Sequence, residues 1–272
     1  MASKGGALCS ATLHPNRKIA NMRHVLDDLL FTASTTKFPF IRIDPTSSKT
    51  TVYAADGIDK SLFLNAHFPP IDELIGIGEF SIGHDPKLLD FIRRQIINGD
   101  GDLSVSPDKT SFTLSKDGLV SRYYRLDDPS MAPKYILKSP PPWSPPLTIL
   151  PTSSAFLAVT RTMAALKSLC DNQFCIKVAD GFVVIELVAS YRSAGSDLGN
   201  TCSIFRLCNT NLPDNTPIRY RIDTFLTVIK AARNDDMTVF LSPTTGLMQC
   251  SFSRDVAGNV LTYNFILPGR HT

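Results

Sequence analysis

The sequence repeats one order of elements on either side of a proline-rich segment at residues 139–151. Before this segment, residue patterns predict a helix at Arg17–Phe31, strand-like runs and a second helix at Pro86–Ile97. After it they predict a helix at Thr152–Leu169, more strand-like runs and a helix at Asp223–Arg233. Corresponding helices begin 135 residues apart (17 and 152) and 137 residues apart (86 and 223). This near-constant offset indicates two copies of one architecture, and repeated units usually build an extended surface rather than a single pocket.

Length and composition are consistent with two folded domains. At 272 residues the chain can hold two units of ordinary size, each long enough to bury its own core. Hydrophobic residues make up 43% and charged residues 19%, which is typical of a folded protein. We therefore expect a flexible N-terminus at 1–14, a first domain at 15–138, a connector at 139–151 and a second domain at 152–272.

Most of the remaining pattern is strand-like. Short runs of alternating, β-branched or aromatic residues are bounded by turns such as Asp-Gly at 56–57 and 180–181. Many short strands with few helices predict the α+β class, with antiparallel sheets and helices packed on one face. The predicted strands are Phe38–Ile43, Thr50–Ala55, Ser111–Leu114, Val120–Leu126, Phe174–Val178, Phe182–Val188, Ser203–Leu207, Met237–Leu241, Leu247–Phe252 and Val260–Leu267.

Each predicted helix carries at least one cation opposite its apolar stripe. In the first helix, Leu26 and Leu30 belong to the stripe, and Asp28 is expected to face solvent. The third helix has a face of small residues around Arg161. If the helices line one surface, they form a sparse basic lining suited to phosphates rather than to reading bases. Solvated helix faces commonly carry Lys and Arg, so an ordinary surface is the alternative.

Motifs for catalysis, cofactors and metals are absent from the sequence. There is no GxxxxGK[ST], GxSxG or HExxH, and Gly76-Ile77-Gly78 lacks a third glycine at dinucleotide spacing. The five histidines are scattered, and the six cysteines form no CxxC pair, which favours cysteines of the core. We expect no enzyme, no cofactor and no metal, with catalytic residues that converge only in three dimensions as the alternative.

No stretch predicts export or membrane insertion. The apolar runs are shorter than the ~20 residues that a membrane-spanning helix needs. The start MASKGGALCSA contains no hydrophobic signal core. We therefore expect a cytoplasmic protein with no membrane partner.

Two long stretches of the second half resemble one known family. Residues 222–269 (IDTFLTVIKAARNDDMTVFLSPTTGLMQCSFSRDVAGNVLTYNFILPG) are similar to the closing pattern of the DNA polymerase sliding clamps, a short helix followed by strands and a Leu-x-Tyr-x-x-Leu-x-Pro-like finish. Residues 151–187 resemble the first helix and hairpin of the clamps' second domain. This family includes proliferating cell nuclear antigen. The DDPSMAPK segment and linker at 127–151 look most like its tailed-bacteriophage branch.

The resemblance implies a ring-shaped processivity factor with the DNA clamp fold, located in the host cytoplasm if the protein is viral. Such two-domain subunits assemble head to tail as homotrimers, with two inner helices per domain around duplex DNA. Their partners are the DNA polymerase, an ATPase that loads the ring and, in the phage branch, late-transcription factors. Because a closed ring retains DNA by topology, diffuse cation–phosphate contacts without sequence preference suffice. The DNA-facing candidates are Arg17, Lys18, Lys87, Arg94, Arg161, Lys230 and Arg233.

The resemblance also implies a pocket for hydrophobic peptides of partner proteins. It is formed by the connector and the last strand, or by a related cleft at the subunit edge. The connector SPPPWSPP is more proline-dense than the family pattern, which stiffens it toward an extended polyproline form. For Trp143, packing on its own domain is an equal alternative. The matching positions are Trp143, Leu147, Ile149, Phe265, Leu267 and Pro268.

Two other functional classes stay open. A single-strand-binding protein would also be basic and β-rich, but it should interleave aromatic residues with cations along its strands. Only Arg122-Tyr123-Tyr124-Arg125 does so, and a role at a sheet edge is favoured for that run. A phage structural protein is the second class, since β-rich repeats also build shells. A preference for circular over linear DNA would separate a clamp from both.

Overall fold

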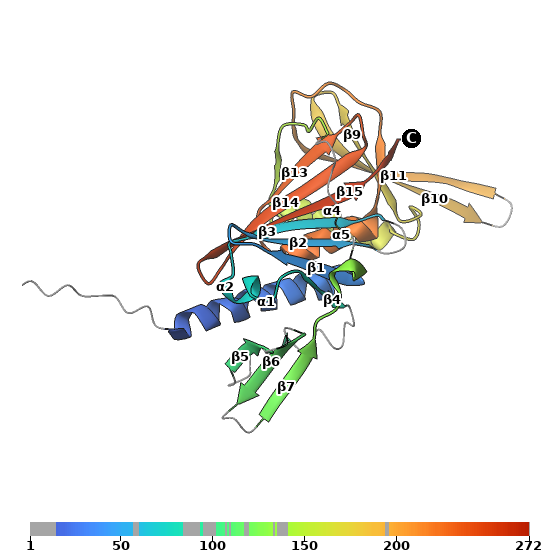
Figure 1. The fold of residues 1–272 in the computed structure, drawn as a ribbon. Coiled ribbons are helices and arrows are strands. Elements are labelled where there is room, and N and C mark those ends of the chain that lie inside the picture. Colours follow the sequence, from blue (N-terminus) through green and yellow to red (C-terminus); the bar gives the residue numbers. More distant parts are fainter. Residues whose placement is uncertain are drawn as a thin grey trace, which may run out of the picture.

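The structure is a computed structural model of the chain (Figure 1). The predicted flexible segment at 1–14 lies outside the described residues. So does the predicted helix at 86–97, apart from residues 93–94, which are helical. The described residues are 15–56, 60–83, 93–94, 102–106, 108, 110–116, 120–132, 134, 141–193 and 196–271.

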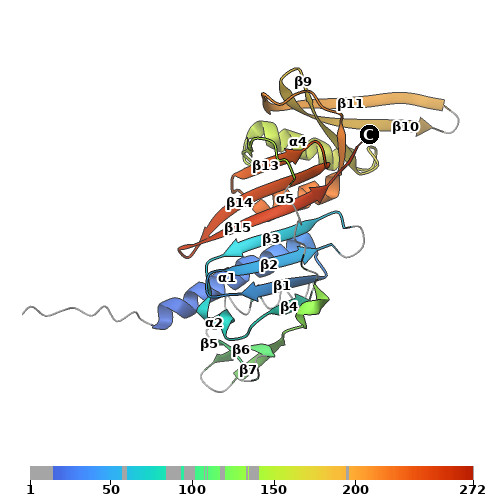
Figure 2. The same cartoon turned by 45° about the horizontal axis from the view of Figure 1, so that its top comes forward.

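Three long helices of the described chain lie together on one side of the molecule (Figures 1 and 2). They are α1 (Pro15–Thr36), α4 (Ser154–Leu166) and α5 (Ile222–Ala232). The middle helix, α5, contacts both of the others. The shorter helical segments are α2 (Asp72–Ile75) and the 3-10 turn η1 (Pro129–Met131).

The helix boundaries follow local signals in the sequence. At the start of α4, the Ser153 hydroxyl accepts a hydrogen bond from the backbone N–H of Phe156 at 3.3 Å, a common N-cap arrangement. At its carboxy-terminal end, α1 stops before Lys37, whose φ of 57° is left-handed, as is common just after a helix. The predicted end at Phe31 was therefore about a turn too early.

All strands of the described chain pair antiparallel, in three sheets. The eight-stranded sheet has the order β4 (Phe80–Gly83), β1 (Phe40–Pro45), β2 (Thr50–Ala55), β3 (Phe63–Phe68), β15 (Asn259–Pro268), β14 (Leu247–Val256), β13 (Met237–Ser242) and β8 (Leu147–Ile149). The five-stranded sheet has the order β11 (Ser196–Asn209), β10 (Phe182–Ser193), β9 (Gln173–Ala179), β12 (Ile218–Arg221) and β16 (Arg270–His271). The three-stranded sheet has the order β5 (Asp102–Val105), β6 (Ser111–Lys116) and β7 (Val120–Arg125).

The two halves of the chain are joined in the middle of the eight-stranded sheet. There β3 of the first half pairs with β15 of the second, in a register that sets Phe63 opposite Ile266 and His67 opposite Thr262. One cluster of buried side chains runs from Leu26 on α1 to Ile185 on β10. The α+β prediction is confirmed, but the hydrophobic core continues across both halves because the sheet itself does.

The connector contributes a strand that was not predicted. Leu147–Ile149 forms β8, which pairs with β13 at the edge of the eight-stranded sheet. Just before it, the Ser144 N–H donates to the carbonyl of Leu241 at 2.7 Å, and the Leu241 N–H donates to the Ser144 hydroxyl at 2.9 Å. Pro145 and Pro146, which have no N–H to donate, lie between these two contacts and β8, and Pro151 follows soon after β8.

Candidate functional site

Helices α1, α4 and α5 form a layer, which we call the helix layer. Its exposed surface carries predicted DNA-facing cations on α4 and α5. Arg161 on α4 and Lys230 on α5 are both exposed. Around Arg161 the surface of α4 is made of small residues, among them Ala158 and Ala165, which are also exposed. This agrees with the predicted small-residue face, on which a polyanion could approach the helix closely.

The other predicted cations are placed less completely. Arg17 and Lys18 belong to α1, but their side chains lie outside the described part of the structure, as does Lys87 as a whole. Arg94 is helical and exposed. The contribution of these four residues to a basic lining therefore stays a prediction.

Arg233 is exposed and makes two contacts with α1. Its guanidinium carbon lies 3.8 Å from the centre of the Phe31 ring, and one of its nitrogens is 3.4 Å from the Asp28 carboxylate. Stacking on an aromatic face and pairing with a carboxylate both stabilise a fixed guanidinium position. Arg233 thus links the end of α5 to α1 while its side chain stays 39% exposed, and its predicted contact with DNA stays a prediction.

The expectation that Asp28 faces solvent was wrong. Its side chain is 5% exposed, because β14 and β15 of the other half of the chain cover it. It accepts hydrogen bonds from Arg254 on β14 at 2.7 Å and from the Tyr263 hydroxyl on β15 at 2.6 Å. Burial and the Asp28 charge raise the pKa of Tyr263 well above its usual value, so the phenol stays protonated and donates.

Arg254 is the centre of this buried network. Besides Asp28, it donates to Asp235 at 2.7 Å and to the carbonyls of Ala231 and Ala232 at 3.0 Å each. Those carbonyls belong to the last turn of α5, where unpaired backbone acceptors favour a cation. The network therefore ties α1 of the first half to α5, β14 and β15 of the second.

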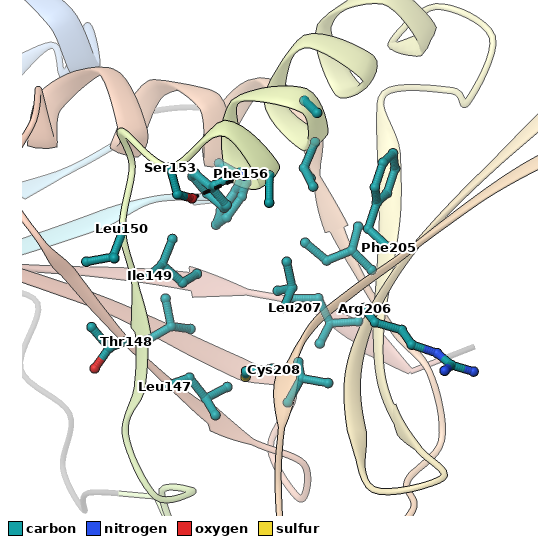
Figure 3. A pocket seen from close by; sticks show the side chains of 18 of the residues that line it. Leu147, Thr148, Ile149, Leu150, Ser153, Phe156, Phe205, Arg206, Leu207 and Cys208 are labelled. Atoms are coloured by element: carbon teal, nitrogen blue, oxygen red, sulfur yellow. Dashed lines mark hydrogen bonds between the residues drawn. The ribbon is translucent and has the colours of Figure 1, made fainter.

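A groove, which we call the edge groove, opens where the connector faces β11 (Figure 3). It has a volume of about 510 Å³ and is lined mainly by apolar side chains of the connector, α4 and β11. Three large apolar residues at or near it are exposed, Ile204 by 60%, Leu150 by 47% and Leu157 by 38%. The strands that border it, β8 and β11, are the outermost strands of their sheets.

The predicted peptide pocket is only partly assembled at this groove. Leu147 and Ile149 line it, whereas Trp143, Phe265, Leu267 and Pro268 are not among its lining residues. Trp143 is half-buried, and Pro268 is exposed at the end of β15.

Phe265 and Leu267 belong to the core instead, with 0% and 1% of their surface exposed. Alternate residues of a strand face opposite sides, so the outer side of β15 carries Ile266 between them. Ile266 packs there with Ala55 and Phe63. Alternation in the sequence could have revealed this difference, since it separates Ile266 from its two neighbours.

The His, Cys, Asp and Glu side chains of the described residues are not clustered as metal ligands are. Among these residues there is no group of three or more His, Cys, Asp or Glu side chains that could hold a metal ion. Cys250 is buried, and burial raises the pKa of its thiol, which disfavours the reactive thiolate. In the same residues, no helix combines the length and the apolar character needed to cross a membrane.

Comparisons with known proteins agree on the fold. No protein-family model and no curated protein matches the chain, but many solved structures do. PCNA of A. fulgidus, solved with the C-terminal region of FEN-1 bound, is 19% identical with a TM-score of 0.60, over 90% of this chain and 96% of that one. PCNA of Entamoeba histolytica is 13% identical with a TM-score of 0.59, over 93% and 96%. The chain has the DNA clamp fold.

A bacterial β clamp shares the same fold. The β clamp of H. pylori, in complex with diflunisal, is 10% identical to this chain with a TM-score of 0.61. The alignment covers 91% of this chain and 64% of the β clamp. At these identities the likeness establishes the DNA clamp fold, whereas function depends on the surfaces that the fold presents.

Proposed function

We propose that the protein is a DNA sliding clamp, a homotrimeric ring that encircles duplex DNA and tethers the replicative DNA polymerase for processive synthesis. Its expected partners are duplex DNA without sequence preference, the polymerase, a clamp-loading ATPase and, following the resemblance to the phage branch, late-transcription factors. The observation that carries the proposal is the pair of complementary open sheet edges, β7 and β11, at opposite ends of the molecule.

The sheet orders support assembly between copies. The eight-stranded sheet reads β4-β1-β2-β3 from the first half and then β15-β14-β13 from the second. The other sheets supply the matching pieces, β12-β9-β10-β11 from the second half and β7-β6-β5 from the first. In this repeat β11 corresponds to β3, and β7 corresponds to β15. Since β3 pairs with β15 inside the chain, β11 should pair with β7 of a neighbouring copy.

The positions of these edges favour a head-to-tail contact. Strands β5–β7 lie at one end of the molecule and β9–β11 at the other (Figures 1 and 2). A single copy therefore cannot pair its own β11 with its own β7. A head-to-tail contact that closes after a few copies gives a ring in which every β7 and β11 edge is paired, which avoids the aggregation that these open edges would promote.

The helix layer and the edge groove fit the same assembly. Repetition of the chain around a closed ring would place α1, α4 and α5 of each copy on a common face, with Arg161 and Lys230 exposed on it. Such sparse cations attract phosphates weakly, which leaves the ring free to slide. The edge groove, bordered by β11, would lie at the contact between copies, where a neighbouring subunit or a partner peptide can cover its apolar side chains.

Two measurements test the proposal. Light scattering should give about 90 kDa, three times the chain mass of 29.9 kDa. The loaded protein should stay on circular DNA and leave linear DNA, because a ring slides off an open end. A monomer at every concentration, or equal retention on circular and linear DNA, would contradict the proposed ring.

A further inference from the structure

A second hollow lies at the amino-terminal end of α5 and differs from the edge groove in chemistry. It has a volume of about 520 Å³, and none of its lining residues lines the edge groove. We call it the basic pocket. Its charged residues are Lys60, Arg219, Arg221, Arg270 and Asp171, so that four cations meet one carboxylate.

Several elements hold the basic pocket together. The Asn172 side chain accepts a hydrogen bond from the N–H of Asp223 at 3.0 Å, which joins the turn after α4 to the first turn of α5. The hydroxyls of Ser61 and Thr224 are 3.4 Å apart, which brings the segment before β3 to the same turn of α5. The pocket is therefore built from both halves of the chain.

Two of its arginines project from the outer face of the five-stranded sheet, away from the helix layer. Arg219 on β12 is exposed, whereas its neighbour Tyr220 is 2% exposed and faces the core. The Tyr220 ring packs on Phe174, and Phe174 packs on Phe225 of α5, which identifies the inner face. Arg270 on β16 is exposed and directly opposite Arg219 in the register, so it shares the outer face. A ligand of these two arginines therefore approaches from the side opposite the helix layer.

The protein neutralises only part of the positive charge of the pocket. Arg221 donates to the Asp223 carboxylate at 3.1 and 2.9 Å. For Lys60, Arg219 and Arg270, no carboxylate among the residues that the structure describes forms an ion pair. Like charges directly opposite each other in a sheet, as Arg219 and Arg270 are, destabilise the pairing. An anionic ligand would remove this repulsion.

The neighbouring strands do not supply the missing negative charge. Cys175 on β9 is opposite Arg219, and burial raises the pKa of its thiol, which therefore stays neutral. The next residue across the sheet is Glu186 on β10, opposite Cys175. Its carboxylate is already paired with Lys177 at 3.2 Å.

An apolar surface borders the basic pocket on the outer side of the eight-stranded sheet. Pro268 lines the pocket, is exposed and is one of the positions that the resemblance predicts for partner peptides. Leu247 on β14 is opposite Pro268 and packs against the outer cluster of Ile266 and Phe63. Cations beside an apolar surface fit a peptide that carries both acidic and apolar side chains.

We propose that the basic pocket binds the carboxylate side chains of an acidic segment in a partner protein. The proposal rests on the sliding-clamp function and names the chemistry of a partner that the ring recruits. Guanidinium groups match carboxylate oxygens geometrically, and three of the four cations are arginines. Duplex DNA inside the ring would face α1, α4 and α5, whereas Arg219 and Arg270 face the other way. Charge and position together thus favour an acidic protein segment on the outside of the ring.

The first test measures the affinity for fluorescein-labelled hexaglutamate by fluorescence anisotropy. The pocket variant is Arg219→Gln/Arg270→Gln. The control with the same loss of charge is Lys37→Gln/Lys49→Gln, at two exposed lysines outside the pocket. The pocket variant should bind about tenfold more weakly than the wild type, because each exposed charge pair contributes up to roughly fivefold. The control should keep the wild-type affinity, and equal losses in the two variants would overturn the proposal.

A charge-preserving variant separates ligand binding from a role in the fold. Arg219→Lys/Arg270→Lys keeps both charges and loses only the planar guanidinium groups, so its affinity should lie between those of the wild type and the pocket variant. Affinity no better than that of the pocket variant would overturn pairing by charge. Without ligand, the pocket variant should melt no lower than the wild type, since it removes a repulsion. A lower melting temperature would mean that the arginines serve the fold and not a ligand.

The same variants decide between an acidic protein segment and nucleic acid. A short linear duplex should bind the wild type and the pocket variant equally, because Arg219 and Arg270 face away from the helix layer. A loss of affinity for the duplex that exceeds the loss for hexaglutamate would overturn the acidic segment in favour of nucleic acid.

These outcomes are distinct from failure of the proposed function. Light scattering on the pocket variant should still give about 90 kDa, because the substituted arginines lie on β12 and β16, away from the open edges β7 and β11. A trimer that is retained on circular DNA, and binds hexaglutamate equally well without these arginines, would end the pocket proposal alone. A wild-type monomer would end the ring instead, and its affinity for hexaglutamate would still be measurable.

Discussion

Replacement of Asp28 should have a large effect on stability. Its side chain is 5% exposed and receives Arg254 at 2.7 Å and Tyr263 at 2.6 Å. Asp28→Asn keeps the shape and removes the charge, so Arg254, itself 9% exposed, keeps only Asp235 as a carboxylate partner among the described residues. Removing one partner of a buried ion pair costs about 3–5 kcal/mol, and because Asp235 remains we expect the lower end, about 3 kcal/mol.

Urea unfolding at fixed protein concentration measures this cost, and thermal melting should fall by roughly 6–12 °C. Asp27→Asn is the matched control on the same helix. Asp27 pairs with Arg93 at 2.7 Å, but both side chains are about one fifth exposed, so its loss should cost about 0.2–1 kcal/mol. If Asp28→Asn lost no more stability than Asp27→Asn, the buried network would not be what holds α1 to the second half of the chain.

Three further predictions concern charge, packing and assembly. Hydrogen bonds from Arg42 hold the pKa of Glu79 at about 2, below its ordinary 4.5, so Glu79→Gln should be less stable by up to about 1 kcal/mol above pH 4.5. That difference should shrink as pH falls toward 2, and persistence at pH 2 in acid titrations of unfolding would contradict the charge argument. Gly269→Ala should lose about 1–3 kcal/mol in urea unfolding, because an added Cβ would meet neighbouring side-chain and backbone atoms at 2.6–2.8 Å, whereas Gly76→Ala has open space and should be near neutral. Equal midpoints for these two variants would refute the packing argument. Ile204→Asp, at a residue 60% exposed on β11, should lower the solution mass from about 90 kDa toward 29.9 kDa without unfolding the chain, and an unchanged mass would count against pairing at that edge.

Local signals predicted many elements closely. The run Thr50–Ala55 is β2 with the same bounds, and the helix expected at 223–233 is α5 at Ile222–Ala232. The Asp-Gly turn before β10 has φ values of 52° and 74°, both left-handed, as a tight hairpin of this type requires. These features depend on neighbouring residues only, so a sequence pattern suffices to predict them.

Errors arose where a residue meets distant parts of the chain. Asp28 has a polar side chain on a surface-type helical pattern, yet its partners Arg254 and Tyr263 are more than 220 residues away in sequence. Leu147–Ile149 is too short and too close to prolines to predict a strand, and only the open edge of β13 makes it one. No local pattern specifies such partners, because each becomes available only when the sheets form.

The amino-acid sequence alone determined the repeated order of helices and strands, the α+β class and the side of each strand that is apolar, since these follow from periodicity and turn chemistry. Tertiary structure decided which edges meet, at β3 with β15, and which stay open, at β7 and β11. It also decided that Arg219 opposes Arg270 and that Asp28 is buried. Strand pairing depends on the combined burial and hydrogen bonding of segments far apart in the chain, which no single segment encodes.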